Sequence, residues 1–317
     1  MQGLPLSRDF YTEIAAPMLQ SELPAYVNQL AVGLVGEGSE CFGFDDDFSQ
    51  DHDWGAGICV WAPESMAGTV EPLLEPVFAR LPATFNGYPV RMAPKFRNGR
   101  VGLFTIEGFY RRFINSGQPL STWQQWYTVP EYFLAVATNG EVFTDPCGQF
   151  SSFRNSLLEF YPDDVMKKKL AARFAVMAQS GQYNLLRMLK RNDTAAALLA
   201  ASRFVESTIG ALYLMHGKYM PFYKWAFRGL KDLPDGAFIA GKLNDVLSLN
   251  LTRGADIHSN AEAAVEAVCV EMMTLLQKKG LSRSNEAWLM TQAEMVQKQI
   301  ENPQIRNLPV VHGVQCS

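Results

Sequence analysis

Cysteine is scarce in this chain, and the few cysteines present form no recognisable framework. They are an odd number, and no two are spaced Cys-x-x-Cys: Cys41, Cys59, Cys147, Cys269 and Cys316. Finger-type zinc sites and disulfide scaffolds both require paired cysteines, so the sequence suggests neither. A reducing compartment is the expected setting.

An excess of basic charge and long apolar runs are also lacking. The chain has 28 Lys and Arg against 32 Asp and Glu, with a net charge of -4 and a pI near 5.7. A broad nucleic-acid footprint normally needs a basic face, so we expect no nucleic-acid partner. No apolar run approaches the ~20 residues of a membrane span, and the first residues lack the build of a signal peptide. These absences predict a soluble, cytoplasmic protein that acts on a small or activated substrate without a membrane partner.

The pattern of apolar residues changes along the chain and indicates two domains. With 317 residues, 48% of them hydrophobic, the chain can build more than one core. Short strand-like runs bounded by glycine and acidic residues dominate the first third, whereas beyond Gln118 apolar residues recur at helical spacing. We therefore predict an α+β protein: a small mixed-sheet domain at residues 1–118, followed by an all-helical domain at residues 119–317.

The same patterns place the individual elements. In the first domain they predict helices over 6–23 and 71–81 and strands over 29–35, 54–61, 88–92 and 100–106. In the second domain they predict helices over 123–137, 163–179, 194–215, 241–251 and 256–278. Residues 302–317 contain two prolines and no helical period, which predicts a surface tail.

The segment of residues 34–61, LVGEGSECFGFDDDFSQDHDWGAGICVW, carries the most chemistry. In an extended strand, Asp51 and Asp53 project to the same side while His52 points to the other. Adjacent carboxylates repel each other, and a cation between them relieves the repulsion. Magnesium is the natural candidate because it prefers one or two carboxylates and completes its shell with water and phosphate oxygens. Two ions held ~3.5–4 Å apart could assist an in-line displacement at phosphorus.

A glycine-rich turn precedes this acidic pair. Gly36, Gly38 and Ser39 follow a predicted strand, and the missing Cβ atoms let the backbone approach an anion closely. If a helix or turn begins here, its free N–H groups form a phosphate cradle to which the serine hydroxyl adds one donor. Glycine-rich turns also follow strands for purely steric reasons, so the turn alone is weak evidence.

Together, the Gly38-Ser39 turn and the Asp51-His52-Asp53 segment resemble the signature of the nucleotidyltransferase superfamily. More narrowly, GSECFGFDDDFSQDHDWG is similar to the domain-of-unknown-function 4037 group, a kanamycin-nucleotidyltransferase-like branch whose members carry GSE, FG-D and S-DHDWG in this order. The resemblance spans about residues 10–230. Its later parts are Val142-Phe143-Thr144-Asp145, Tyr161-Pro162 and the segment from Tyr219 to Trp225.

This resemblance implies a magnesium-dependent enzyme that transfers a nucleotidyl group from a nucleoside triphosphate, such as ATP, to an acceptor and releases pyrophosphate. Gly38 and Ser39 would hold the triphosphate, and Asp51 and Asp53 would bind one or two magnesium ions. An acceptor hydroxyl on a small molecule is the first choice, with the helical domain closing that side. The alternative is a catalytically inactive nucleotide-binding or regulatory protein that retains the fold.

Superfamily members use a third carboxylate on a later strand as metal ligand or general base. The resemblance suggests Glu107, which ends the run VGLFTIE, with Asp145 as second choice. The remaining alternative is that the third acid is absent, which keeps the inactive alternative open. Lys224 lies in the aromatic segment YMPFYKWAF and has two interpretations, a contact to the triphosphate or a lysine whose stem covers aromatic surface.

Competing interpretations of the same residues carry less weight. His52-Asp53 also spells the dipeptide of metal phosphohydrolases, but the other histidines, His216, His258 and His312, lack ligand spacing. The three consecutive acids at 45–47 are expected to form a solvated loop. Cys41 has no partner histidine in the sequence pattern, so a thiol nucleophile is not expected.

Overall fold

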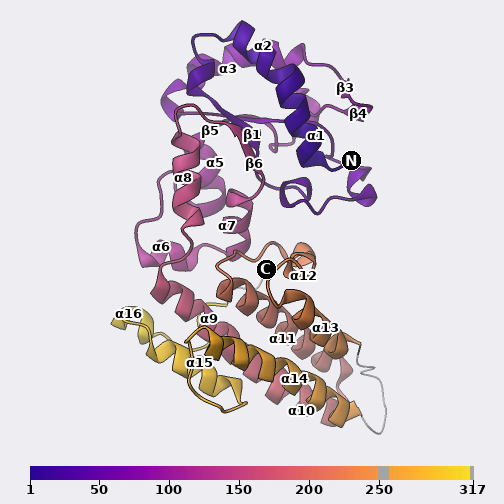
Figure 1. Cartoon of the computed structure of the whole chain (residues 1–317), viewed down its shortest axis with the longest axis vertical. Coiled ribbons are helices and arrows are strands. Elements are labelled where there is room, and N and C mark those ends of the chain that lie inside the picture. Colours follow the sequence, from indigo (N-terminus) through magenta and orange to yellow (C-terminus); the bar gives the residue numbers. More distant parts are fainter. Residues whose placement is uncertain (249–256, 315–317) are drawn as a thin grey trace. The chain divides into compact units, whose positions relative to one another are not determined.

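Figure 1 shows a computed structural model of the chain, which describes residues 1–248 and 257–314. The chain forms two compact units. Unit 1 consists of Met1–Ser121 and Phe133–Glu159, and unit 2 of Thr122–Tyr132 and Phe160–Ser317. Unit 1 contains the strands and unit 2 is helical, so the predicted α+β class with a small mixed sheet and a helical part is confirmed.

The central sheet of unit 1 has the strand order β5-β2-β1-β6. Strand β1 is antiparallel to both of its neighbours, whereas β2 and β5 are parallel. Every residue of β1 and β2 is buried, which explains their continuous apolar sequences. The strands are β1 Ala31–Leu34, β2 Cys59–Ala62, β5 Gly102–Thr105 and β6 Glu141–Thr144, with a separate hairpin of β3 Thr84–Phe85 and β4 Tyr88–Pro89.

Helices cover this sheet on both sides (Figure 1). On one side Trp61 of β2 stacks on Phe150 with ring centroids 3.9 Å apart and meets Phe109 edge to face. The predicted opening helix is one continuous helical stretch that passes through a π-helical turn at Tyr11–Ala15. The helices of unit 1 are α1 Gly3–Phe10, α2 Ala16–Glu22, α3 Glu64–Ala79, α4 Pro94–Arg97, α5 Ile106–Ile114 and α8 Gln149–Leu158.

Unit 2 is organised around α9, which packs against α11 and α15. Its helices are α6 Trp123–Thr128, α9 Asp163–Met177, α10 Leu186–Lys190, α11 Thr194–Met215, α12 Tyr223–Leu230, α13 Gly236–Leu247, α14 Ile257–Lys278, α15 Leu289–Lys298 and α16 Pro303–Arg306. A π-helical segment, Ala178–Leu185, joins α9 to α10, and α7 Glu131–Thr138 belongs partly to each unit.

Three sequence expectations need correction. The predicted helix over 123–137 is two helices, because Val129 adopts an extended conformation before Pro130. Strand β6 lies where no strand was expected, and α16 lies within the predicted tail. Residues 249–251 of the predicted helix over 241–251, and Asp256 at the start of the helix predicted over 256–278, lie outside the described residues.

Helix α11 is the one helix in the described part of the chain that is long and apolar enough to cross a membrane. The helix was predicted over 194–215, but not as a candidate membrane span. Of its most apolar 18-residue window, 56% is buried within the structure, as in core helices that pass the same test. Length and composition alone therefore give only weak evidence for a membrane span.

Candidate functional site

The glycine-rich turn directly follows β1, and a side chain from before β6 fixes its backbone. Gly36 has a φ of 133°, a conformation that favours glycine. Asn139 holds it from both sides: its Oδ1 accepts from Gly36 N at 2.9 Å, and its Nδ2 donates to Gly36 O at 2.9 Å. The next residue, Gly140, donates its N–H to Cys41 O at 2.8 Å. The turn is therefore anchored to the start of β6.

Ser39 begins a short 3-10 turn, Glu40–Phe42, rather than an α-helix. Its carbonyl oxygen accepts from the N–H groups of Phe42 at 3.1 Å and Phe44 at 2.9 Å. Its side chain makes no capping hydrogen bond to the turn. The hydroxyl is therefore not committed as a helix cap, but the turn offers fewer free N–H groups than the first turn of an α-helix.

Gly38 lies against the carboxylate of Glu40. A Cβ atom at this position would be 2.6 Å from Glu40 Cδ, so only glycine fits without a shift. The carboxylate itself is buried and pairs with a buried arginine: Arg91 Nη2 donates to Glu40 Oε1 at 3.0 Å. The glycine therefore serves the packing of an ion pair as well as any approach of a ligand.

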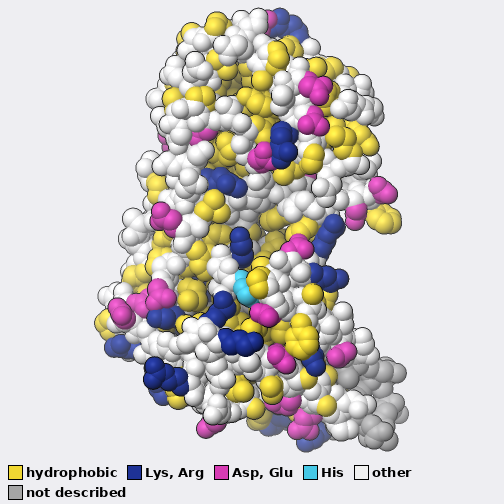
Figure 2. Space-filling view, viewed as in Figure 1, with side chains coloured by type: hydrophobic (Ala, Val, Ile, Leu, Met, Phe, Trp, Pro, Cys, Tyr) yellow, Lys and Arg dark blue, Asp and Glu magenta, His cyan; other side chains and the backbone are white. Residues whose placement is uncertain are grey.

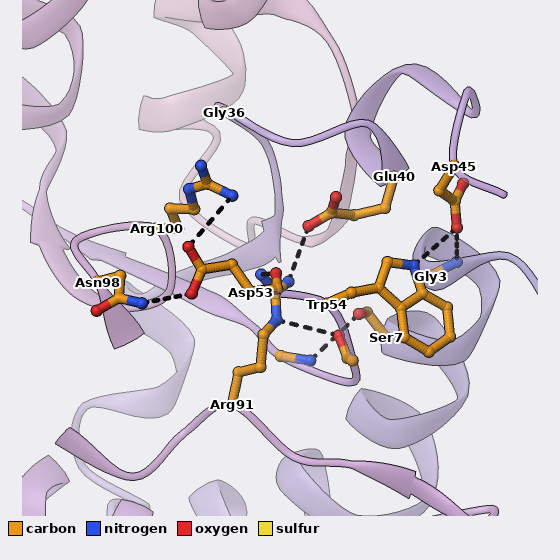
Figure 3. A network of polar contacts seen from close by, with 12 residues as sticks. Gly3, Ser7, Gly36, Glu40, Asp45, Asp53, Trp54, Arg91, Asn98 and Arg100 are labelled. Atoms are coloured by element: carbon orange, nitrogen blue, oxygen red, sulfur yellow. Dashed lines mark hydrogen bonds and ion pairs between the residues drawn. The ribbon is translucent and has the colours of Figure 1, made fainter. Parts of the chain in front are cut away.

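Arg91 connects the turn after β1 with the segment that contains Asp53 (Figure 3). Besides its bond to Glu40, it donates from Nη1 to Asp53 O at 2.5 Å and from Nε to Gly55 O at 3.2 Å. A single buried guanidinium thus satisfies two backbone carbonyls and one carboxylate. Arg91 therefore links the glycine-rich turn after β1 to the acidic segment that contains Asp53.

Asp53 has an uncommon backbone and a partly buried side chain. Its φ of 52° lies in the left-handed region, which non-glycine residues rarely adopt. Its carboxylate is 25% exposed, accepts from Asn98 Nδ2, and lies 3.8 Å from Arg100 Nη1. Figure 3 shows both of these side chains meeting the carboxylate from the same loop. The Asp53 carboxylate therefore already has one neutral and one cationic partner in this structure.

Asp51 is much more exposed than Asp53. It is the last residue of a 3-10 turn, Asp47–Asp51, which Asp46 caps through a capping box. Its Oδ1 lies 2.6 Å from His52 Nδ1, and both side chains are mainly in solvent. The carboxylate that the sequence analysis paired with Asp53 is thus bound to its own neighbour.

The strand predicted over 54–61 begins only at Cys59, so the argument that Asp51 and Asp53 share one face of a strand does not hold. The residues before β2 use their backbone groups elsewhere: Ala56 N donates to Pro89 O at 2.9 Å, and Arg91 N donates to Ala56 O at 2.8 Å. Because these two hydrogen bonds go to Pro89 and Arg91, the residues just before β2 do not continue its strand. The turn and the left-handed Asp53, and not strand alternation, set the directions of the two carboxylates.

The acidic trio at 45–47 is only partly the solvated loop that was expected. Asp45 is 6% exposed, and its Oδ2 accepts from Gly3 N at 2.6 Å and from Trp54 Nε1 at 3.0 Å. It therefore binds the first turn of α1 and the residue next to Asp53. Asp46 and Asp47 are both exposed, and Asp46 also caps the turn that follows.

Both candidates for a third carboxylate bind helix N-termini. Glu107 lies in the first turn of α5, just past the end of β5, and its Oε2 accepts from Glu64 N of α3 at 3.0 Å. Asp145 follows β6, and its Oδ2 accepts from Ser151 N of α8 at 2.7 Å. Carboxylates at helix N-termini are stabilised by the unpaired N–H groups there. Each acid thus has a structural role in the state described.

Lys224 belongs to unit 2 and lies in the first turn of α12. It is exposed, and its Nζ lies 5.5 Å from the centroid of the neighbouring Trp225 ring. This geometry is what a lysine covering aromatic surface shows. A contact of Lys224 to a triphosphate stays a prediction.

Several arginines pair with the acidic residues of the motif, and the sequence analysis missed most of them. Arg112 of α5 forms an ion pair with Glu37 of the turn and donates to Gly99 O at 2.5 Å. With Arg91 on Glu40 and Arg100 on Asp53, each cation faces an acid of the turn or of the acidic segment. Two of them left a signal in the sequence: Arg112 belongs to the basic pair Arg111-Arg112 just after the predicted strand over 100–106, and Arg91 interrupts the apolar run at 88–92.

The carboxylates of Asp51 and Asp53 are the type of ligand that magnesium prefers. Within residues 1–248 and 257–314, no group of three or more histidine, cysteine or acidic side chains is arranged to hold a metal ion. Magnesium does not require such a cage, because it uses one or two carboxylates and takes its other ligands from water and substrate phosphates. Asp51 and Asp53 would hold the ion in the presence of a phosphorylated substrate.

The buried thiols near the motif are poor nucleophiles. Burial raises the pKa of the Cys59 thiol to about 12 and also raises the pKa of Cys41 well above its usual value. Thiolates, rather than thiols, are the reactive species. Thiol chemistry near neutral pH is therefore not expected at these two positions.

Residues 126–226 match the model of a family described as Domain of unknown function (DUF4037). The matched segment runs from α6 to α12 and supports the resemblance to that group. It does not include the Gly38 to Asp53 segment, and no activity follows from it because the function of the family is unknown. No curated protein and no solved structure matches the chain.

Proposed function

We propose that this chain is a magnesium-dependent enzyme of the nucleotidyltransferase superfamily, which moves a nucleotidyl group from a nucleoside triphosphate to an acceptor hydroxyl and releases pyrophosphate. The observation that carries the proposal is the pair of hydrogen bonds that Arg91 donates to Glu40 and to the backbone of Asp53. These bonds hold the turn after β1 and the acidic segment before β2 in a fixed position relative to each other. A fixed arrangement of this kind suits a site that must place phosphates and a metal together.

The charges around the turn support a triphosphate as ligand. In the structure, Arg100 and Arg112 are neutralised by Asp53 and Glu37. Bound magnesium would draw Asp53 and Asp51 toward itself and offset the phosphate charge. Arg100 would then lose its carboxylate partner and be able to pair with a phosphate oxygen instead. Gly36, Gly38 and Ser39 let the backbone of the turn approach that anion.

A small molecule is the proposed acceptor. The net charge is -4, and on the face that Figure 2 shows, acidic and basic side chains are scattered among apolar ones without gathering into one basic surface. Nucleic-acid acceptors normally require such a surface. Glu107, or Asp145 in its place, stays the predicted third ligand or base, and a contact of Lys224 to the triphosphate also stays a prediction.

One observation favours a second candidate, a nucleotide-binding or regulatory protein without catalysis. Glu107 and Asp145 both bind helix N-termini, so neither is free to act as a base without giving up a cap. A protein that keeps Asp51 and Asp53 but lacks a third acid could bind a metal–nucleotide complex without turning it over.

Label transfer separates the two candidates. The protein is incubated with magnesium, each of the four nucleoside triphosphates labelled at either the α- or the γ-phosphate, and a small-molecule extract of cells as acceptor pool. Nucleotidyl transfer moves the α-label into a new product and releases the γ-label as pyrophosphate. Binding without any labelled product supports the regulatory candidate. Transfer of the γ-label, or release of the γ-label as orthophosphate, contradicts nucleotidyl transfer.

A further inference from the structure

Three ionisable side chains are buried together in unit 2, in a region that the proposed function does not use. Lys169 and Arg173 of α9 are 1% and 2% exposed, and Glu131 at the start of α7 is 6% exposed. Lys169 is close enough to both of the others for its pKa to respond to their charges. Arg173 Nη2 pairs with Glu131 Oε2 at 3.3 Å.

The charges in this cluster do not balance. An arginine keeps its charge in proteins, and a lysine next to a carboxylate is stabilised as a cation. Burial lowers the pKa of Lys169 to about 8, which leaves the side chain mainly protonated near neutral pH. Two cations therefore share one carboxylate, Glu131. Because an uncompensated buried charge is strongly destabilising, the cluster lacks about one negative charge.

Hydrogen-bond donors in the cluster are also unsatisfied. Within the described residues, Arg173 Nε and Nη1 are buried without a hydrogen-bond partner, and so is the hydroxyl of Tyr161. These atoms carry three guanidinium N–H groups and one O–H. Buried polar groups nearly always have a partner, so a group of unpaired donors beside excess positive charge points to a missing acceptor of negative charge.

The surroundings keep the donors in place. Lys169 Nζ lies 5.6 Å from the ring centroid of Tyr127 and 5.1 Å from that of Tyr161, so aromatic faces flank the ammonium group. Gly210 of α11 makes room for the guanidinium, since a Cβ there would lie 2.7 Å from Arg173 Cζ. All of these residues fall within the segment that matches the DUF4037 family.

We propose that Lys169, Arg173 and Tyr161 form a binding site in unit 2 for an oxyanion group, the phosphate or carboxylate of a small molecule. The oxyanion supplies the missing charge and accepts from the guanidinium and the tyrosine hydroxyl, while Glu131 holds Arg173 from its other nitrogen. This site lies in unit 2 and does not depend on magnesium or on the activity proposed for unit 1.

Anion titration of the full chain tests the proposal. Phosphate and pyrophosphate form one arm, and acetate and citrate form the other. Each is added by calorimetry in the presence of EDTA, against sodium chloride of equal ionic strength. Saturable binding is expected in at least one arm, and the arm in which binding is tighter names the ligand class. The melting temperature is expected to rise with the same anion.

Two variants and a matched control locate the binding. Lys169→Met leaves Arg173 and Glu131 as a balanced pair, so it should fold and weaken anion binding about tenfold or more, the value of one charge-assisted hydrogen bond. Gly210→Ala, which crowds the guanidinium, should weaken binding too. Lys168→Met is the control, because Lys168 is equally buried but donates to Gln297 Oε1 and to backbone carbonyls instead.

The proposal is overturned if none of the four anions binds beyond the chloride control while the protein is folded. It is also overturned if Lys169→Met binds as tightly as the unmodified chain. Binding that is lost in Asp53→Asn but kept in Lys169→Met would place the anion in unit 1 and contradict the site in unit 2. Failure of nucleotide binding by unit 1 leaves the result of this titration unaffected.

Discussion

Arg91 and Glu40 form an ion pair in the interior of unit 1, with Nη2 and Oε1 3.0 Å apart and side chains that are 5% and 4% exposed. The same guanidinium holds the backbone of Asp53. A buried pair of this kind is weak evidence for stability in itself, because desolvation offsets the attraction. The role of this ion pair is to hold the glycine-rich turn and the acidic segment in a fixed arrangement.

Removing one partner of this pair should be costly. Arg91→Met leaves Glu40 as a buried, unpaired carboxylate, so the free energy of unfolding is expected to fall by about 3–5 kcal/mol. The double variant Arg91→Met/Glu40→Gln removes both charges and should recover a large part of that loss. Urea unfolding of the single and double variants measures both values. A single variant within about 1 kcal/mol of the unmodified chain would contradict the account of the pair.

Asn139 should control the order of the turn after β1. Asn139→Ala removes the two hydrogen bonds to Gly36, at a cost of about 1–3 kcal/mol if its backbone groups are left unsatisfied. Hydrogen exchange read by mass spectrometry should then show faster exchange in a peptide that covers residues 35–42. A peptide from α11 is the internal control, because unit 2 is not altered. Unchanged exchange in the turn would mean that other contacts suffice to hold it.

Glu107 offers a test of whether its role is structural or catalytic. Because its carboxylate caps α3 at Glu64 N, Glu107→Ala should lower the free energy of unfolding by about 1 kcal/mol. Glu107→Gln keeps an acceptor oxygen and should restore most of that stability. A large loss of turnover in Glu107→Gln at unchanged stability would identify Glu107 as the third carboxylate. Unchanged turnover would leave Glu107 the structural role alone and pass the proposed catalytic role to Asp145.

Lys169 should make stability depend on pH in the alkaline range. Burial lowers its pKa in the folded protein to about 8, against 10.5 for an unperturbed lysine. Below about pH 8 both states bind the proton and the cost of the buried cation is present in full. Between about 8 and 10.5 the unfolded state binds more protons, so the folded state gains stability as pH rises.

Urea unfolding at pH 7.5 and 9.5 measures this effect. The unmodified chain should gain stability relative to Lys169→Met between the two values, and the comparison cancels groups common to both proteins, including the buried tyrosines. A difference between the two proteins that stays constant with pH would show that Lys169 is not a buried cation.

The sequence predicted the fold class well because burial dictates the pattern. Strands β1 and β2 are buried on both faces and therefore read as continuous apolar runs, and α11 is helical over the whole of its predicted range, Thr194–Met215. Strand β6 escaped detection because Glu141 and Thr144 give it no apolar pattern and each of its residues is half-buried. Its place in the sheet comes from pairing with β1, which is a tertiary effect.

The candidate site was predictable in its motif but not in its geometry. Gly38, Ser39, Asp51 and Asp53 stand out by residue type and spacing. The left-handed conformation of Asp53 has no local sequence signal, and it invalidates the strand argument. Asn98, Arg100 and Asn139 come from distant segments and meet the motif only through the fold, so periodicity and spacing could not identify them.

Whether unit 1 binds a metal–nucleotide complex is decided by calorimetric titration of the protein with each of the four nucleoside triphosphates, with and without magnesium. We expect that at least one of them binds, that binding requires magnesium, and that Asp51→Asn and Asp53→Asn each weaken it about tenfold or more, while the exposed acid control Asp47→Asn does not. No binding of any triphosphate to the folded protein, or binding that is indifferent to magnesium and to both aspartates, would contradict this expectation.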